Sequence, residues 1–236
     1  MGVIGGISPQ ATMDFEARVH HASQRLIPQR WNGGYPPMVV WYSRTPPIRL
    51  GADDLPVMPL ALDPGLVEAA AWLGRASDFL VITCNTAHIG LQALAKAAAC
   101  PILSMIDVAV GEIDRRGWKR VGVLGFHGAP PLYLDPLRRR GIHCETIGPS
   151  LQEPLDAGIR AVAEGRDGAA ETGHALAAVA ALRAAAVDGA VLGCTEIPLL
   201  LGKDGEAADL LSPAALLADA AVRFAIGEPA SGTRTS

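Results

Sequence analysis

Short runs of apolar residues recur along the chain, separated by segments whose apolar residues follow helical spacing. Runs of four or five apolar residues are typical of parallel strands covered on both faces. The pattern predicts strands at 1–7, 38–42, 80–84, 101–105, 120–125, 143–147 and 190–194. It predicts helices from about residue 11, at 64–75, 86–98, 107–116 and 131–140, and helical segments over 150–186 and 207–226. This alternation indicates an α/β fold with parallel sheets.

The order of the predicted elements repeats once. A strand, a glycine turn and a helix are followed by a strand that ends in cysteine and by another helix, and the same order restarts at Arg120. We therefore predict two pseudo-symmetric, Rossmann-like α/β lobes with parallel sheets and an active-site cleft between the lobes. The expected first lobe comprises residues 1–104 and 210–227, the second comprises 105–209, and 228–236 form a disordered tail.

Composition narrows the class of protein. The chain has 236 residues, half of them apolar, and a formal net charge of -4. Such a mild acidic balance favours neither a nucleic-acid partner nor an anionic membrane. No apolar run reaches the length of a membrane span, and the N-terminus lacks the basic region of a signal peptide. Four cysteines at irregular spacing do not suggest a disulfide framework, so we expect a cytoplasmic enzyme with reduced thiols.

The first strand leads into a glycine-rich turn, Gly5-Gly6-Ile7-Ser8-Pro9, and then into a helix. Backbone N–H groups and a helix N-terminus could hold a phosphate or carboxylate there. The dinucleotide motif GxGxxG is absent, and a turn that simply needs glycine explains the pattern equally well. After the strand at 38–42, Arg44 or Arg49 could bind a substrate carboxylate, or could be a solvated loop residue.

The strongest chemical signal is a pair of cysteines in matching contexts, in Thr83-Cys84-Asn85-Thr86 and Gly193-Cys194-Thr195-Glu196. Each cysteine ends an apolar strand, and ligands of parallel sheets bind beyond the carboxyl ends of their strands. One cysteine after a strand is more often a buried filler than a catalyst. Two with neighbouring donors and helix starts instead favour reactive thiols, which could deliver and remove a proton on opposite faces of one carbon.

Other cysteine chemistries fit less well. The chain has no CxxC pair for disulfide exchange and no four-ligand spacing for zinc. A papain-like nucleophile would leave the second cysteine unexplained. Cys100 and Cys144 are interpreted as structural. His88 and Glu196 either tune the two thiols or only order the helix starts.

Three separated motifs, Met1-Gly-Val-Ile-Gly-Gly-Ile-Ser-Pro-Gln-Ala-Thr-Met-Asp14, Cys84-Asn-Thr-Ala-His88 and Gly193-Cys-Thr-Glu-Ile-Pro198, occur in order along the chain. Together they resemble the aspartate/glutamate racemase superfamily, and its aspartate racemase branch most. The likeness extends to about Gly227. It implies two α/β lobes, a homodimer, an amino-acid or dicarboxylate substrate, and proton transfer by two cysteines without PLP, metal or another cofactor.

The resemblance also implies roles for individual residues. Cys84 and Cys194 would be the acid/base pair, and Arg49 would bind the side-chain carboxylate. The α-carboxylate and amino group would be held by Asn85, Thr86 and Thr195. The remaining expected substrate-binding residues are Gly6, Ser8, Thr12, Ser43 and Glu196.

Some positions differ from the family pattern. The second glycine turn has no threonine and carries Ala129, while Glu164 and Ser212 stand where lysine and aspartate are frequent. These differences leave the substrate open between aspartate and another amino acid. The alternatives within the superfamily are a maleate cis-trans isomerase and a hydantoin racemase, because arylmalonate decarboxylases keep only one cysteine. A non-catalytic protein that binds a small carboxylate is the alternative from another class.

Overall fold

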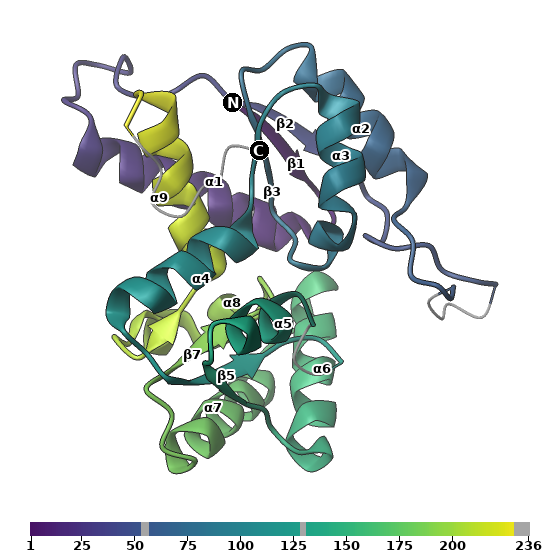
Figure 1. Ribbon diagram of the computed structural model, residues 1–236, viewed down its shortest axis with the longest axis vertical. Helices are drawn as coiled ribbons and strands as arrows, with labels where there is room; N and C mark the ends of the chain where they lie inside the picture. Colours follow the sequence, from purple (N-terminus) through teal and green to yellow (C-terminus); the bar gives the residue numbers. More distant parts are fainter. Residues whose placement is uncertain (53–56, 128–130, 229–236) are drawn as a thin grey trace. The chain divides into compact units, whose positions relative to one another are not determined.

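The computed structural model describes residues 1–52, 57–127 and 131–228 (Figure 1). The chain divides into two compact units: unit 1 comprises residues 1–108 and the segment from 214 onward, and unit 2 comprises residues 109–213. The boundary at 108/109 falls within helix α4 (Met105–Arg116). Each unit contains one parallel four-stranded sheet with flanking helices, which confirms the predicted α/β class. Ala129 and residues 229–236 of the expected tail lie outside the described residues.

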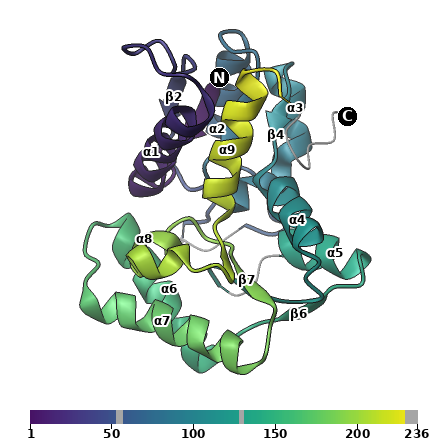
Figure 2. The same ribbon diagram turned by 90° about the vertical axis from the view of Figure 1, so that its left-hand side faces the viewer.

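The sheet of unit 1 has the strand order β2-β1-β3-β4, and every neighbouring pair is parallel. Its strands are β1 (Gly2–Gly5), β2 (Val39–Tyr42), β3 (Leu80–Ile82) and β4 (Ile102–Leu103). Helices α1 (Pro9–Leu26) and α9 (Pro213–Ala225) cover one face, and α2 (Pro64–Gly74) and α3 (Leu91–Ala98) cover the other (Figures 1 and 2). Val3 packs with α1 and α9, whereas Ile4 packs with α2 and α3, since successive strand residues face opposite sides.

The sheet of unit 2 repeats this topology with the order β6-β5-β7-β8, again all parallel. Its strands are β5 (Arg120–Leu124), β6 (His143–Glu145), β7 (Gly189–Leu192) and β8 (Leu210–Leu211). Leu124 and Leu192 belong to a core cluster with residues of α6 (Pro149–Ala163), α7 (Ala169–Ala184) and α8 (Ile197–Leu201). Helix α5 (Pro131–Arg139) adds the buried side chains of Tyr133 and Leu137.

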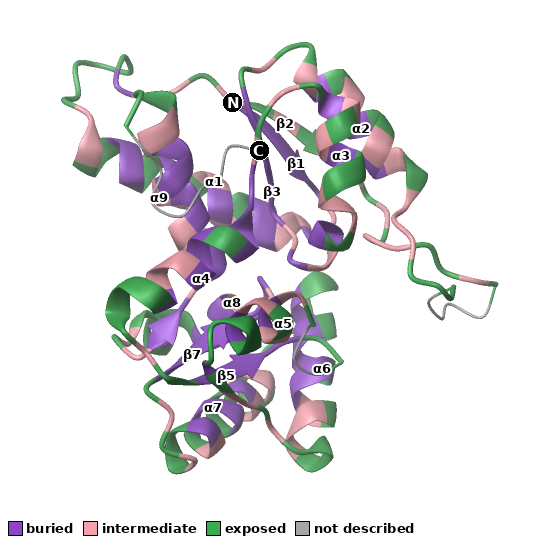
Figure 3. Ribbon diagram, in the orientation of Figure 1, coloured by how far each residue is buried: buried purple, intermediate pink, exposed green. Residues whose placement is uncertain are grey.

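Burial explains the apolar runs of the sequence. Strands β1, β3 and β7 are buried along their whole length (Figure 3). They lie in the interior of their sheets with helices on both faces, so each residue contacts a helix whichever way it points. Strand β2 lies at a sheet edge and alternates between exposed and half-buried residues. No helix in the described part of the chain is long and apolar enough to span a membrane.

The structure corrects three predictions of helix. Residues 86–98 form a 3-10 helix, η1 (Thr86–Gly90), followed by α3, because Gly90 leaves helical geometry between them. The segment 150–186 is two helices, and Gly165 adopts a left-handed φ of 68° after α6 ends. The segment 207–226 contains β8, whose two residues are too few to show a period. Helix α8 and a second 3-10 helix, η2 (Gly202–Glu206), were not predicted.

Candidate active site

The two cysteines follow strands at corresponding places in the two sheets. The strand order of each sheet reverses beside its first strand, between β1 and β3 in unit 1 and between β5 and β7 in unit 2. Ligands of open parallel sheets bind beyond the carboxyl ends of the strands at such a point. Cys84 follows β3 beside the Gly6 turn that follows β1. Cys194 follows β7 beside the Gly125 turn that follows β5.

The turn after β1 requires glycine at position 6. Gly6 has a φ of 71°, and a Cβ atom there would lie only 2.3 Å from Cα of Tyr42. The adjacent chain continues to pair with the turn, because Ser43 N–H donates to the Gly5 carbonyl (2.9 Å) and Arg44 N–H to the Gly6 carbonyl (3.2 Å). Steric crowding therefore accounts for the glycine, whether or not the turn also binds an anion.

Thr12 connects the Gly6 turn to the strand that leads to Cys84. Its Oγ1 accepts from Gly6 N–H at 2.9 Å, donates to the Ser8 carbonyl at 2.9 Å, and lies 3.1 Å from Oγ1 of Thr83. The single proton of the Thr83 hydroxyl has two acceptors within reach, Oγ1 of Thr12 and, at 3.4 Å, the Ile4 carbonyl. Both threonines are buried, and Ser8 caps α1. The structure thus joins the predicted residues Gly6, Ser8 and Thr12 to Thr83, which the sequence did not single out as a site residue.

His88 holds the backbone of the Cys84 loop. Its Nε2 accepts from Met105 N–H at 3.1 Å, so the proton of the neutral ring is on Nδ1, which donates to the Cys84 carbonyl at 2.9 Å. Burial lowers the pKa of His88, which keeps the ring neutral. Of the two roles left open by the sequence, the hydrogen bonds of His88 support ordering of the loop.

Glu196 contacts the second thiol directly. Sγ of Cys194 donates to Oε2 of Glu196 at 2.9 Å, and Oγ1 of Thr195 donates to the same oxygen at 3.3 Å. Thr195 and Glu196 are buried, whereas Cys194 is half-buried. A carboxylate that accepts from sulfur requires the proton to be on the sulfur. These contacts support a role for Glu196 in tuning the thiol.

Tyr133 is a neighbour of Cys194 that the sequence did not reveal. Burial raises the pKa of Tyr133 well above its usual range, and nearby Cys194 raises it further, so the phenol stays neutral. The Tyr133 ring lies close to the end of β7. A Cβ atom on Gly193 would lie 3.3 Å from this ring and 2.6 Å from the Leu124 carbonyl oxygen. In the sequence, Tyr133 and Leu137 show only the spacing of helix residues that face a core.

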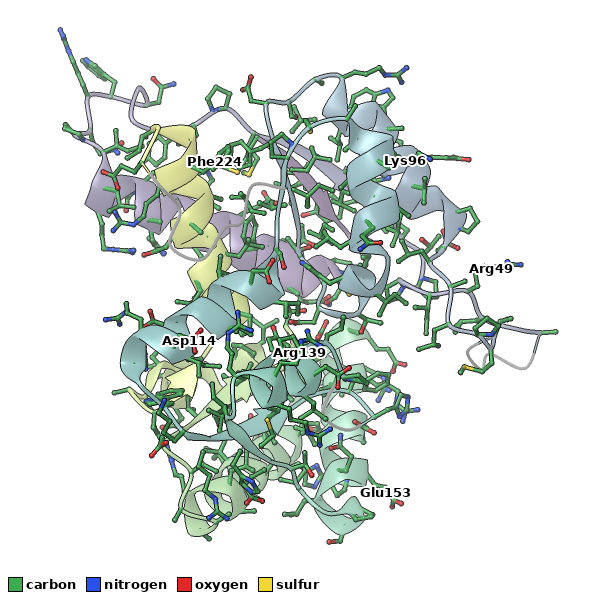
Figure 4. All side chains as sticks on the ribbon, in the orientation of Figure 1. Arg49, Lys96, Asp114, Arg139, Glu153 and Phe224 are labelled. Atoms are coloured by element: carbon green, nitrogen blue, oxygen red, sulfur yellow. The ribbon has the colours of Figure 1, made fainter. Side chains whose placement is uncertain are left out.

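The other predicted site residues differ in burial. Asn85 is buried and Thr86 is half-buried, both directly after Cys84. Oγ of Ser43 is buried without a hydrogen-bond partner among the described residues. Arg49 is exposed on the loop before α2, and its side chain extends away from the sheet of unit 1 (Figure 4). Arg49 is therefore not part of the hydrogen-bonded network around Gly6.

The remaining two cysteines have different surroundings. Cys100 and Cys144 are half-buried. Burial raises the pKa of both thiols, which makes them poorer nucleophiles at neutral pH. This agrees with their interpretation as structural residues. Across residues 1–52, 57–127 and 131–228, no group of three or more His, Cys, Asp and Glu side chains is placed to hold a metal ion.

Two parallel sheets of identical strand order, each with a cysteine after the strand at its switch point, define an α/β protein with a repeated nucleus and a matching pair of thiols. The profile of the Asp/Glu/Hydantoin racemase family matches residues 4–221, and the chain belongs to this family. The family resemblance of the three sequence motifs is thereby confirmed.

Part of the chain is similar in sequence to a bacterial amino-acid racemase. Over 126 residues the chain is 27% identical to the broad specificity amino-acid racemase RacX of Bacillus subtilis (strain 168). The match covers 53% of this chain and 53% of the relative, so it spans about half the length of that protein.

Solved structures share the fold over nearly the whole chain. The aspartate racemase of Picrophilus torridus superposes with a TM-score of 0.75 at 20% identity, covering 98% of this chain and 95% of the other. PH1733, an aspartate racemase homologue from Pyrococcus horikoshii OT3, gives 0.73 at 21% identity, covering 95% and 98%. The maleate isomerase Iso of Pseudomonas putida S16 gives 0.59 at 18% identity, covering 98% and 95%. At these identities the likeness shows the fold and does not select among the reactions.

Proposed function

We propose that the chain is a cofactor-independent amino-acid racemase for aspartate or a related dicarboxylic amino acid, with Cys84 and Cys194 as its acid/base pair. The observation that carries the proposal is the position of both cysteines after the switch-point strands of two sheets with the same topology. Membership of a racemase family supports the same reaction class.

The reaction needs one thiolate and one thiol at the start. The thiolate takes the proton from Cα, and the C–H electron pair stays on the substrate as a carbanion. The thiol then gives its proton to the opposite face of Cα, which inverts the configuration. The two cysteines finish with their protonation states exchanged, so no proton is gained or lost overall.

A Cα proton beside a carboxylate is a very weak acid, so the carbanion has to be stabilised by preorganised donors. We assign Asn85, Thr86 and Thr195 to the α-carboxylate and amino group, because they flank the two thiols in sequence. Gly6, Ser8, Thr12 and Ser43 complete the proposed binding residues. The buried Oγ of Ser43, which has no hydrogen-bond partner among the described residues, supports the assignment of Ser43. The hydroxyl of Thr12 supports the site by holding the Gly6 turn.

Glu196 favours one resting arrangement of the two thiols. Its carboxylate accepts a hydrogen bond from Sγ of Cys194, and a carboxylate so close opposes a second negative charge on that sulfur. Cys194 is therefore assigned as the protonated acid of the resting enzyme. Cys84 is assigned as the thiolate base.

Three further parts of the proposal concern binding, assembly and location. Arg49 is assigned to the side-chain carboxylate of the substrate, since a long exposed cation on a loop can reach a bound anion.

A homodimer is supported by edge strand β2, which exposes Trp41 beside Trp72 with ring centroids 5.7 Å apart. A monomeric mass by sedimentation equilibrium would contradict it. Reduced thiols fit the cytoplasm.

The experiment follows the Cα proton of L-aspartate, and then of other amino acids, by proton NMR in D₂O. The wild-type protein is expected to remove the Cα–H signal and to form the D-enantiomer. Cys84→Ala and Cys194→Ala should each lower racemisation by about 1,000-fold or more, because each removes one of the two proton carriers. Cys100→Ala and Cys144→Ala are the matched controls in the two units and should retain activity.

If the Cys84→Ala variant and the Cys194→Ala variant both still exchange the Cα proton at the wild-type rate, the two-cysteine mechanism is contradicted. Wild-type protein that exchanges no amino acid would contradict the racemase proposal itself. Maleate and hydantoins would then be tested as substrates, and calorimetry with small carboxylates would test a non-catalytic binding role.

A further inference from the structure

The turn after β5 contains a histidine that the proposed reaction does not use. Gly125, Phe126 and His127 follow the last residue of β5, and β5 lies beside β7, whose continuation carries Cys194 (Figure 1). Gly193 N–H donates to the Leu124 carbonyl at 2.7 Å, so the two strands are still paired where they end. His127 and Cys194 therefore leave the same edge of the sheet of unit 2.

Two side chains of α6 hold this turn in place. Oδ1 of Asp156 accepts from His127 N–H at 2.9 Å and from Nε2 of Gln152 at 2.7 Å. The Gln152 amide also donates to the Gly125 carbonyl at 2.9 Å. Asp156 is buried, and a buried carboxylate is retained only where several donors compensate its lost hydration.

The same carboxylate orients the imidazole. Oδ2 of Asp156 lies 3.2 Å from Nδ1 of His127, so the ring proton on Nδ1 points at the carboxylate. The side chain of His127 is 64% exposed, against 8% for Asp156. Nε2 is consequently the ring atom that can meet a ligand, and in the imidazolium form both ring nitrogens donate.

The backbone of His127 adopts a conformation that is uncommon for residues other than glycine. The residue has a φ of 56°, a left-handed conformation that glycine adopts most readily. A turn that only had to reverse the chain would be easier to form with glycine at this place. Here an imidazole stands in a disfavoured conformation, fixed by Asp156 through its backbone and its ring.

The charges around the imidazole come from the turn and from α6. Asp156 is the anion in contact with the ring. The Phe126 ring lies 3.9 Å from the His127 ring between centroids, and the Arg160 guanidinium lies 5.5 Å from the Phe126 centroid. The imidazole thus lies beside an aromatic ring that a basic residue of α6 also contacts, so positive charge is available close to this turn for an anionic ligand.

We propose that His127, oriented by Asp156, is a specificity-determining residue that donates a hydrogen bond from Nε2 to the side-chain carboxylate of the substrate. The inference rests on the proposed racemase function, in which residues beside the two cysteines hold the α-carboxylate. Asp156 acts through His127 and is a positioning residue.

The test compares L-aspartate with L-asparagine, which has the same shape without the charge. His127→Asn is the chosen variant, because asparagine tolerates the left-handed conformation and its Nδ2 can replace the Nδ1–H donor to Asp156. It removes Nε2 and the cationic form. The ratio of kcat/KM for aspartate to that for asparagine, measured by Cα exchange in D₂O, should fall by about 10-fold or more, the size of a lost hydrogen bond between charged groups.

A matched control exists in the same unit. Nε2 of His143 lies 2.9 Å from Glu145, and the His143 side chain is 65% exposed, but it begins β6 and so lies at the amino edge of the sheet. His143→Asn should leave the aspartate-to-asparagine ratio within about 2-fold of wild type. Asp156→Asn should lower the ratio less than His127→Asn does, because it removes the carboxylate that orients the ring but leaves an Nε2 that can still carry the donating proton. Circular dichroism checks that each variant is folded.

The inference is overturned if folded His127→Asn keeps the wild-type ratio, or if it slows both substrates equally. Calorimetric binding of the two amino acids gives the same ratio without turnover. It separates failure of the inference from failure of the racemase proposal: a wild-type protein that binds aspartate but does not exchange it contradicts the function alone. Loss of the aspartate preference in the His127→Asn binding measurement would still support His127.

Discussion

Units 1 and 2 have the same strand order, but different interactions hold the turns beside their two cysteines. In unit 1 the Gly6 turn presses against the backbone of β2 and is held by the neutral hydroxyl of Thr12. In unit 2 the turn at His127 is held by the buried carboxylate of Asp156. The first turn depends on steric fit, whereas the second depends on a charge.

The neighbours of the two thiols differ in the same way. In unit 1, the buried ring of His88 is neutral and binds the Cys84 carbonyl. In unit 2, the Glu196 carboxylate accepts directly from the Cys194 sulfur. A repeated backbone can therefore present two cysteines at corresponding strand ends with different chemical groups beside them. The proposed reaction needs the two thiols to differ, because it starts from one base and one acid.

The largest effect is expected where unit 1 relies on steric fit. Gly6→Ala forces a left-handed φ on alanine and places its Cβ against the Tyr42 backbone. The combined strain should lower the free energy of unfolding by about 3–5 kcal/mol, or prevent unit 1 from folding. Urea denaturation followed by circular dichroism measures the change.

Gly141→Ala is the control for that substitution. Gly141 has a φ of 72°, but no atom lies within 4 Å of its ideal Cβ position. Only the conformational term applies, so the loss should be about 1–2 kcal/mol. Equal losses for the two variants would show that contact with β2 does not determine the choice of glycine at position 6.

A smaller effect is expected when the charge beside Cys194 is removed. Glu196→Gln keeps the shape of the side chain and leaves an oxygen that can accept from the thiol. Without the carboxylate charge, thiolate forms more readily at Cys194, so its alkylation by iodoacetamide should accelerate about 3- to 10-fold. Mass spectrometry of the Cys194 peptide over time measures this rate, and the Cys84 peptide should react as in wild type.

Glu153→Gln provides the matched control, since Glu153 is an exposed carboxylate on α6 of the same unit (Figure 4). It should leave both alkylation rates at their wild-type values. If the alkylation rate of Cys194 is unchanged in Glu196→Gln, the charge of Glu196 does not make the two thiols differ.

The smallest expected effect concerns the neutral ring of His88. Burial lowers its pKa, so between about pH 7 and pH 5 the unfolded chain binds a proton that the folded chain does not. Protonation then favours unfolding, and the stability contribution present at neutral pH is lost as the pH falls. In His88→Gln the fall in unfolding free energy between pH 7 and pH 5 should be smaller by about 1 kcal/mol.

Urea denaturation at the two pH values measures this difference. His21→Gln is the control, because His21 is exposed on α1, and it should keep the wild-type dependence on pH. If His88→Gln keeps the wild-type change in unfolding free energy between pH 7 and pH 5, the buried neutral ring of His88 does not contribute to that change.

Much of the fold was predictable because it rests on local pattern. The apolar runs before Cys84 and Cys194 became β3 and β7, buried between helices. The two-residue strand β8 and the break after α6 were not predictable. The first owes its existence to pairing with β7, a contact distant in sequence, and the second to the left-handed conformation of Gly165.

The candidate site divides in the same manner. Cys84, Cys194 and the Gly6 turn could be identified because residues near strand ends are placed by the sheet itself. Asp156 lies on α6 and reaches a turn 29 residues away in sequence, so no local spacing marks it. No sequence pattern distinguishes Tyr133 either, because its position in the helical repeat is that of any residue facing the core.

The sequence by itself determined the α/β class, the two parallel sheets and the family, because periodicity and short motifs are properties of neighbouring residues. Only the tertiary structure decided which side chains meet the strand ends: His88 on the Cys84 carbonyl, Glu196 on the Cys194 thiol and Asp156 on His127. Hydrogen bonds and burial set the protonation of such groups, and both depend on how the chain packs.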